Sequence, residues 1–237
     1  MSEYCLWCHV RYHRRMNWHR LLGMEPSDVL CGDCRSRLLL INGDVCQGCG
    51  RPFEGTENWR HEEGWCADCL RWQGDHAWSG VLEKNRSVYV YNDFLKEVIS
   101  RWKFRGDYAL MEAFRHDLCR EFYRHFSAES LLVPIPLSRE RLYERGFNQA
   151  AALAQMLPLP ALDVLERSDA KKQSKKSRRE RLRTEQLFRL RSSESLHGAS
   201  IVLIDDIYTT GTTVRHAARM LREAGAAAVS SFTLARS

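Results

Sequence analysis

The stretch IVLIDDIYTTGTTVRHAARML, residues 201–221, decides the fold that we expect for this chain. It begins with four apolar residues, a pattern typical of a strand that is buried on both faces of a parallel sheet. Two adjacent carboxylates, Asp205 and Asp206, come next, followed two residues later by four threonines and one glycine in five positions. The remainder has apolar residues at helical spacing. The stretch therefore predicts a strand that ends at the acid pair, then a polar loop, then a helix.

The acid pair and the Thr/Gly loop together predict a ligand site. In an open α/β sheet, ligands bind beyond the carboxyl ends of the strands, where helix N-termini point. The loop offers backbone N–H groups and hydroxyls at a helix start, and this combination favours a phosphate. The two carboxylates can accept hydrogen bonds from sugar hydroxyls or hold a Mg²⁺ that a diphosphate shares. The loop lacks the lysine and the spacing of a P-loop, which argues against an ATPase.

Strands and helices alternate on the N-terminal side of this stretch and after it. This alternation predicts a doubly wound α/β domain with a parallel sheet flanked by helices. We expect strands at residues 87–93, 131–133, 161–165, 201–204 and 228–234, and helices at residues 93–104, 108–126, 147–157 and 213–226.

The first 69 residues hold eight of the nine cysteines, all in C-x-x-C pairs. Two such pairs complete one tetrahedral four-thiolate zinc site, so we expect about two structural zinc ions. Pairing in chain order is the simplest arrangement, but the spacing also allows a crossed one. Four copies of the motif argue against thioredoxin-like redox chemistry. We predict a double zinc ribbon over residues 1–75 and an α/β domain over residues 76–237, with these metal ligands: Cys5, Cys8, Cys31, Cys34, Cys46, Cys49, Cys66 and Cys69.

Positive charge is concentrated in one short segment. The chain has a net charge of +6, and residues 167–183 alone contain nine basic and two acidic residues. We interpret this segment as a mobile loop with a helical second half that binds a polyanion; the alternative is a solvated run of charges. No apolar run approaches the roughly 18 residues of a membrane span. The N-terminus also lacks the pattern of a secretory signal, so we expect a cytoplasmic protein.

The stretch VLIDDIYTTGTTV resembles the phosphoribosyl-pyrophosphate loop of type I phosphoribosyltransferases. The resemblance implies that Asp205 and Asp206 hold the ribose hydroxyls, with Mg²⁺ bound alongside the phosphoribosyl pyrophosphate. It implies that the 5′-phosphate is held by Thr209, Thr210, Gly211, Thr212 and Thr213.

The same resemblance assigns a pyrophosphate loop to PIPLSRERLYERGFNQ, residues 134–149. Its donors would be Ser138, Arg139 and Arg141, since the forked guanidinium suits a diphosphate. A solvated turn with local ion pairs is the alternative. Lys103 and Arg105, after the first helix, either reach the same site or remain surface charges.

Nearly the whole chain resembles the ComFC-like members of the ComF family of competence proteins. The likeness rests on the C-x-x-C region, KFRGD at residues 103–107, VPIPLSRERLYERGFNQA at residues 133–150, and the phosphoribosyl loop. It implies a late-competence protein that handles single-stranded DNA during natural transformation. A DNA-uptake helicase or channel is an expected partner, with peripheral contact at the inner face of the membrane. The alternative is an active phosphoribosyltransferase that acts on an unknown nucleobase or nucleic-acid acceptor.

The basic segment occupies the place of the flexible catalytic loop in this superfamily. Ala170 stands where threonine is usual, and Thr184 stands where asparagine is usual. The segment can instead engage the phosphates of a single strand, with steep salt dependence. The residues concerned are Lys171, Lys172, Gln173, Lys175, Lys176, Arg178, Arg179 and Arg181. Base stacking by the tryptophans at positions 7, 18, 59, 65 and 72 is a further possibility, although such residues more often cover a metal-built core.

Overall fold

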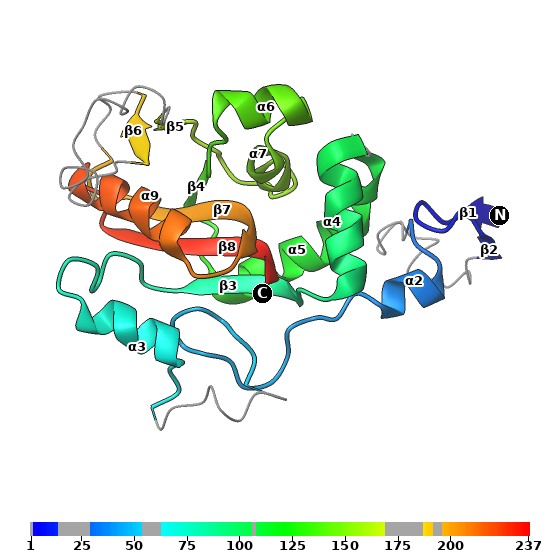
Figure 1. Cartoon of the computed structure of the whole chain (residues 1–237), viewed down its shortest axis with the longest axis horizontal. Helices are drawn as coiled ribbons and strands as arrows, with labels where there is room; N and C mark the ends of the chain where they lie inside the picture. The colour runs from blue at the N-terminus through cyan, green and yellow to red at the C-terminus, as the bar shows by residue number, and fades with distance from the viewer. Residues whose placement is uncertain (1, 14–28, 54–62, 106–107, 169–186, 192–195) are drawn as a thin grey trace.

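A four-stranded parallel sheet forms the centre of the protein (Figure 1). The computed structural model describes residues 2–13, 29–53, 63–105, 108–168, 187–191 and 196–237. The strands follow the order β3-β8-β7-β4, which confirms the predicted parallel sheet. Their bounds are β3 (Asn85–Val90), β4 (Leu131–Pro134), β7 (Ser200–Tyr208) and β8 (Ala228–Arg236).

In the described residues, helices and two small antiparallel ribbons accompany this sheet. The helices are α2 (Gly32–Ser36), α3 (Ala67–Gly74), α4 (Asp93–Arg105), the 3-10 turn η2 (Tyr108–Met111), α5 (Glu112–His125), α6 (Arg139–Arg145), α7 (Gln149–Ala154) and α9 (Thr212–Glu223). The ribbons pair β1 (Ser2–Tyr4) with β2 (Arg11–His13), and β5 (Leu165–Arg167) with β6 (Phe188–Leu190).

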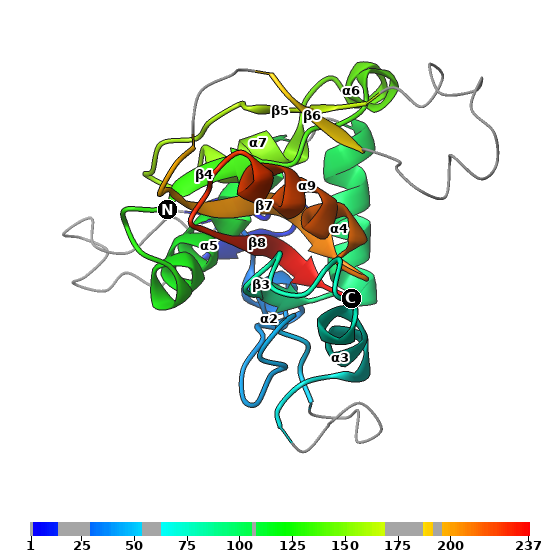
Figure 2. The same cartoon turned by 90° about the vertical axis from the view of Figure 1, so that its left-hand side faces the viewer.

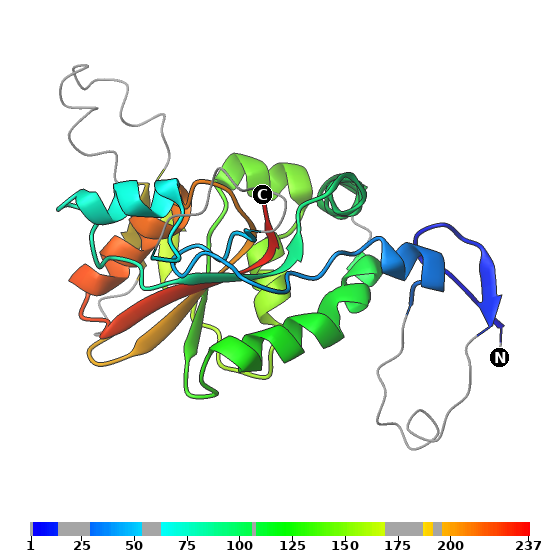
Figure 3. The ribbon, with the colours of Figure 1, turned by 90° about the horizontal axis from the view of Figure 1, so that it is seen from below.

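The central strand β7 supplies apolar side chains to two cores, one on each face of the sheet. Val202 and Ile204 pack with residues of α4, α5 and α7. Ile201 and Leu203, which point the other way, pack with residues of α9. Figure 3 shows α5 and α9 on opposite sides of the sheet. This is the reason for the uninterrupted apolar run in the sequence, because a strand covered on both faces has no polar side.

The cysteine-rich region contributes to both cores. Cys5, Cys31 and Cys34 belong to the core beside α5, and the last four C-x-x-C cysteines belong to the core beside α9. The connecting chain follows the free edge of β3, where the Ile41 N–H donates to the Val88 carbonyl at 3.0 Å. An ion pair joins the half-buried Arg35 of α2 to the buried Asp117 of α5 at 3.2 Å. The contacts therefore cross the predicted boundary at residue 75, which itself stays a prediction.

The structure differs from the expected elements in several places, three of which lie near the candidate site. β7 continues through Asp205, Asp206 and Tyr208, because Ile207 and Tyr208 still pair with Ala235 and Arg236 of β8. The segment expected as a pyrophosphate loop folds in part into α6. The short strand expected at residues 161–165 instead lies at Leu165–Arg167 and pairs with β6.

The helices that the structure describes include none with the length and apolar character needed to cross a membrane.

Candidate functional site

A cavity of about 150 Å³ opens at the carboxyl ends of β4 and β7. Loops leaving these parallel strands meet at one edge of the sheet, which is where ligands bind in open α/β folds. The cavity brings together side chains from α4, α6, β5 and β7. Six of the residues that line it are ionisable: Lys103, Arg141, Arg145, Arg167, Asp205 and Asp206.

The two aspartates predicted to bind the ligand both line this cavity. Burial, followed by repulsion from Asp206, raises the pKa of Asp205 to about 8. The backbone N–H of Asp206, which donates to Asp205 Oδ1 at 2.9 Å, and the nearby Lys103 partly offset this rise. The free protein therefore keeps Asp205 mostly protonated at neutral pH, so a bound cation or donor would have to displace that proton.

Lys103 forms an ion pair with Asp206, and both side chains are largely buried. The sequence left open whether Lys103 reaches the site or remains a surface charge, and the structure places it in the cavity lining. The side chain of Arg105 lies outside the described part of the chain. Sequence reasoning did not assign Arg167 to this site. Burial and repulsion from Arg141 lower the pKa of Arg167, whereas Asp205 raises it. These three side chains all line the cavity.

Thr213 lines the cavity and lies in the first turn of α9. Gly211 precedes this helix with a φ of 81°, and a Cβ there would lie 2.1 Å from the Tyr208 hydroxyl. Only glycine fits such a position. Gly211 offers no side-chain cap, and the first turn holds no acidic residue. The positive end of a 12-residue helix is thus left for an anion.

The three predicted pyrophosphate donors have different surroundings. Ser138 caps α6, where its hydroxyl oxygen accepts from the Arg141 N–H at 3.3 Å. Arg139 is mostly exposed and pairs with Glu166 of β5 at 3.3 Å. Arg141 lines the cavity. Figure 2 shows α6 next to the β5–β6 ribbon, which agrees with the Arg139–Glu166 contact.

The eight C-x-x-C cysteines gather into two separate clusters. Cys5, Cys8, Cys31 and Cys34 form the first, and Cys46, Cys49, Cys66 and Cys69 the second, with the sulfurs of each within 4.8 Å of one another. Pairing in chain order is therefore confirmed. The Cys8–Cys31 and Cys49–Cys66 sulfurs are 3.7 and 3.6 Å apart. Bonds of about 2.3 Å to a tetrahedral zinc require about 3.8 Å, so both clusters fit a structural zinc ion.

The second cluster lies beside two arginines. Arg236 is buried and donates to Cys49 Sγ at 3.4 Å. Burial lowers the pKa of Arg86, and Cys46 and Cys49 counteract this effect. One Zn²⁺ with four thiolates is doubly negative, so two guanidinium groups suit its charge.

The comparisons with known proteins agree with this geometry. The phosphoribosyl transferase domain family matches residues 143–237. The chain is 45% identical to competence protein ComFC of Bacillus subtilis, over 98% of this chain and 95% of that protein. It is 35% identical to competence protein ComFC of Streptococcus pneumoniae, over 98% of this chain and 99% of that one.

The chain belongs to the ComFC family of competence proteins.

A more distant relative of the chain is named a DNA utilization protein rather than a competence protein. The chain is 27% identical to DNA utilization protein YhgH of Escherichia coli K12, over 87% of this chain and 96% of that protein.

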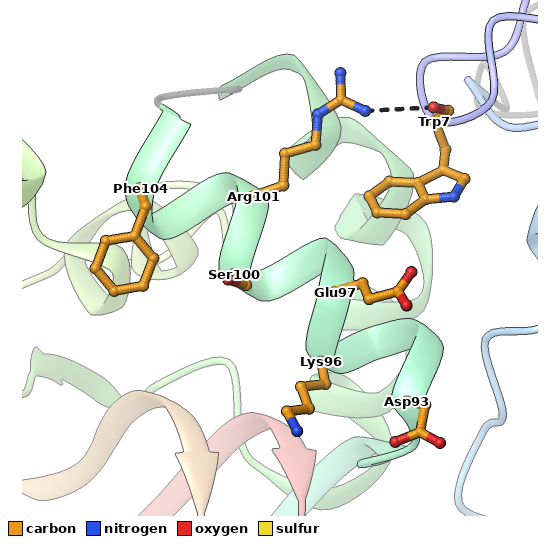
Figure 4. A pocket seen from close by; sticks show the side chains of 7 residues that line it. All are labelled: Trp7, Asp93, Lys96, Glu97, Ser100, Arg101 and Phe104. Atoms are coloured by element: carbon orange, nitrogen blue, oxygen red, sulfur yellow. Dashed lines mark hydrogen bonds between the residues drawn. The ribbon is translucent and has the colours of Figure 1, made fainter.

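A larger cavity, of about 690 Å³, lies on the outer side of α4 in this ComFC family member. Figure 4 shows its lining, in which Arg101 donates to the Trp7 carbonyl at 3.3 Å. Asp93 and Glu97 are mixed there with Lys96 and Arg101, so the charges of the lining nearly cancel. This cavity therefore offers no concentrated charge for either a phosphate or a cation.

Some predicted site residues of this ComFC family member lie outside the described residues. They are Trp18, Trp59 and the basic segment from Lys171 to Arg181. The other tryptophans of the cysteine-rich region contact protein atoms. Trp7 packs against Phe94 with ring centroids 5.3 Å apart, and Trp65 and Trp72 lie near the second cluster.

Proposed function

We propose that this chain binds phosphoribosyl pyrophosphate with Mg²⁺ in the cavity and single-stranded DNA through its basic segment, in the uptake of DNA during natural transformation. The observation that carries the ligand part is the convergence of two aspartates and four cationic side chains on one cavity beside the start of α9. A sugar that carries a phosphate at one end and a diphosphate at the other needs both kinds of group.

The lining suggests a role for each side chain. Asp205 and Asp206 accept hydrogen bonds from the ribose hydroxyls or coordinate Mg²⁺, whose preferred ligands are carboxylate oxygens. Arg141, Arg145 and Arg167 face the diphosphate. The Thr209–Thr213 loop and the first turn of α9 take the 5′-phosphate. Because Lys103 pairs with Asp206 in the free protein, ligand binding has to share or replace that pair.

The competence role is supported by the names of the relatives. Two are named competence protein ComFC, and a third is named DNA utilization protein. A positively charged segment suits single-stranded DNA, since phosphate neutralisation dominates such binding.

Two measurements on one pair of variants test this proposal. Asp205→Asn combined with Asp206→Asn should abolish binding of phosphoribosyl pyrophosphate in calorimetry. Its affinity for labelled single-stranded DNA, followed by fluorescence anisotropy, should stay within about twofold of wild type because the two sites are separate. Asp163→Asn combined with Glu129→Gln is the matched control, since these exposed carboxylates lie outside the cavity lining. Loss of DNA affinity in the folded cavity variant would contradict the proposal of two sites.

Transfer of the phosphoribosyl group to an acceptor is the second candidate function. The match to the phosphoribosyl transferase domain family favours it, and so does the group of arginines placed to neutralise a departing pyrophosphate. Release of pyrophosphate should then occur with one acceptor among the nucleobases or single-stranded DNA. Clear binding of phosphoribosyl pyrophosphate without turnover on any of them would exclude the transferase.

A further inference from the structure

Trp72, in the cysteine-rich region, holds the backbone of the Thr209–Thr213 loop. Its indole N–H donates to the Thr210 carbonyl at 3.2 Å, across 138 residues of sequence. Arg215, in the first turns of α9, lies over the same indole ring, with the guanidinium carbon 4.6 Å from the ring centroid. One side chain therefore contacts the loop and the helix that follows it. Figure 3 shows α3, which carries Trp72, beside α9.

The second cysteine cluster determines where Trp72 lies. Cys66 is the N-cap of α3 and Cys69 lies within it, so two of the four sulfurs hold the helix one turn before Trp72. A helix of eight residues is too short to be stable alone. The position of α3 therefore depends on the tetrahedral site, whose folding free energy comes from zinc.

A second connection links the cluster to the loop through Arg236. Arg236 donates to Cys49 Sγ at 3.4 Å and to the Tyr208 carbonyl at 3.2 Å. The Tyr208 hydroxyl accepts from Arg215 Nη1 at 2.7 Å, and Gly211 packs directly on this pair. In the described part of the chain, no carboxylate forms a salt bridge with Arg236. A buried guanidinium needs an anion, and the zinc thiolates supply it.

We propose that the second zinc site sets the conformation of the Thr209–Thr213 loop, with Trp72 and Arg215 as its positioning residues. Loss of zinc from this site alone then loosens the loop and weakens binding of the anion. The first zinc site has no such effect, because its cluster packs beside α4 and α5. The identity of the anion rests on the proposed function, but the effect of the second zinc site on the loop conformation does not.

Hydrogen exchange and ligand titration on full-length variants test this inference. Trp72→Phe keeps an aromatic side chain but removes the donor, and Trp7→Phe is the matched control beside the first cysteine cluster. Zinc content and circular dichroism should match wild type in both. In Trp72→Phe, amides of a peptide covering residues 208–214 should exchange about three- to tenfold faster, the fold-change of one neutral hydrogen bond. Affinity for phosphoribosyl pyrophosphate with Mg²⁺ should fall by a similar factor, whereas Trp7→Phe should change neither quantity.

A pair of cysteine variants tests the role of the metal. Cys8→Ser should lose the first zinc and keep ligand affinity, whereas Cys69→Ser should lose the second zinc and bind at least tenfold more weakly. If Cys69→Ser does not fold, Trp72→Phe alone decides. Wild-type exchange rates at residues 208–214 in Trp72→Phe would overturn the inference. If wild type itself bound no phosphoribosyl pyrophosphate, the proposed function would fail. The exchange rates of residues 208–214 would still test whether Trp72 holds the loop conformation.

Discussion

The ammonium group of Lys103 on α4 pairs with the carboxylate of Asp206 on β7, at the edge of the sheet where the cavity opens. The same ammonium group lowers the pKa of the neighbouring Asp205. Lys103 thus pairs directly with one aspartate and favours the ionised form of the other.

Lys103→Met should raise the pH at which ligand binding reaches half of its maximal affinity. Without Lys103, the pKa of Asp205 rises further above about 8, so the ionised form that receives Mg²⁺ becomes rarer at neutral pH. Calorimetry across pH 6 to 9 should show that half-maximal affinity needs a higher pH than in wild type. Lys96→Met, on the outer side of α4, is the control. An unchanged pH profile for Lys103→Met would contradict the assignment.

Asp205→Asn should stabilise the free protein at neutral pH. An aspartate ordinarily has a pKa of about 3.8, and burial raises that of Asp205 to about 8 in the folded protein, so only the folded state holds this proton between the two values. The free energy of unfolding therefore falls as pH rises through this window, and an amide avoids the loss. The variant should melt higher than wild type by at least about 2–4 °C near pH 8, with a smaller difference near pH 5. Asp163→Asn, which is exposed, should show no such trend. A melting temperature at or below wild type near pH 8 would be inconsistent with a protonated Asp205.

Metal analysis should find two zinc ions per chain, one for each cysteine cluster. Cys8→Ser should reduce the content to one because it removes a ligand of the first cluster only. Cys119→Ser is the control, since Cys119 belongs to neither cluster. One zinc ion in the wild-type protein would mean that one cluster holds no metal.

Removal of charge from the basic segment should flatten the salt dependence of DNA binding. Each phosphate contact on a single strand contributes a slope of about −0.7 in a plot of log K against log salt. Lys171→Gln combined with Lys172→Gln should therefore reduce the slope by about 1.4. Lys84→Gln combined with Lys96→Gln removes the same charge elsewhere and should leave the slope unchanged. An unaltered slope in the first variant would exclude the segment as the DNA site.

The sequence predicted the sheet and the metal clusters well because their signals are local. The apolar run before Asp205 indicated a buried parallel strand, and the C-x-x-C spacing indicated two four-thiolate sites. Helix α6 was missed since none of its residues is buried, which leaves no apolar periodicity. Its capping residues, Ser138 and the left-handed Gly146, were the signal that could have revealed it.

The cavity depends on contacts that no local pattern records. Lys103 and Arg167 come from α4 and β5, far apart in the chain, and meet near Asp205 only because the strands carry their loops to one edge. The extension of β7 past the acid pair depends on pairing with β8. The contact of Trp72 with Thr210 likewise requires the cysteine-rich region to lie on the α/β domain.

Calorimetric titration of phosphoribosyl pyrophosphate with Mg²⁺ into the zinc-loaded wild-type protein tests the central claim most directly. We expect saturable binding of one ligand per chain in the wild type and in the Asp163→Asn, Glu129→Gln control, and none in a folded Asp205→Asn, Asp206→Asn variant. Equal binding by the wild type and the Asp205→Asn, Asp206→Asn variant, or no binding by the wild type, would contradict the assignment of this cavity.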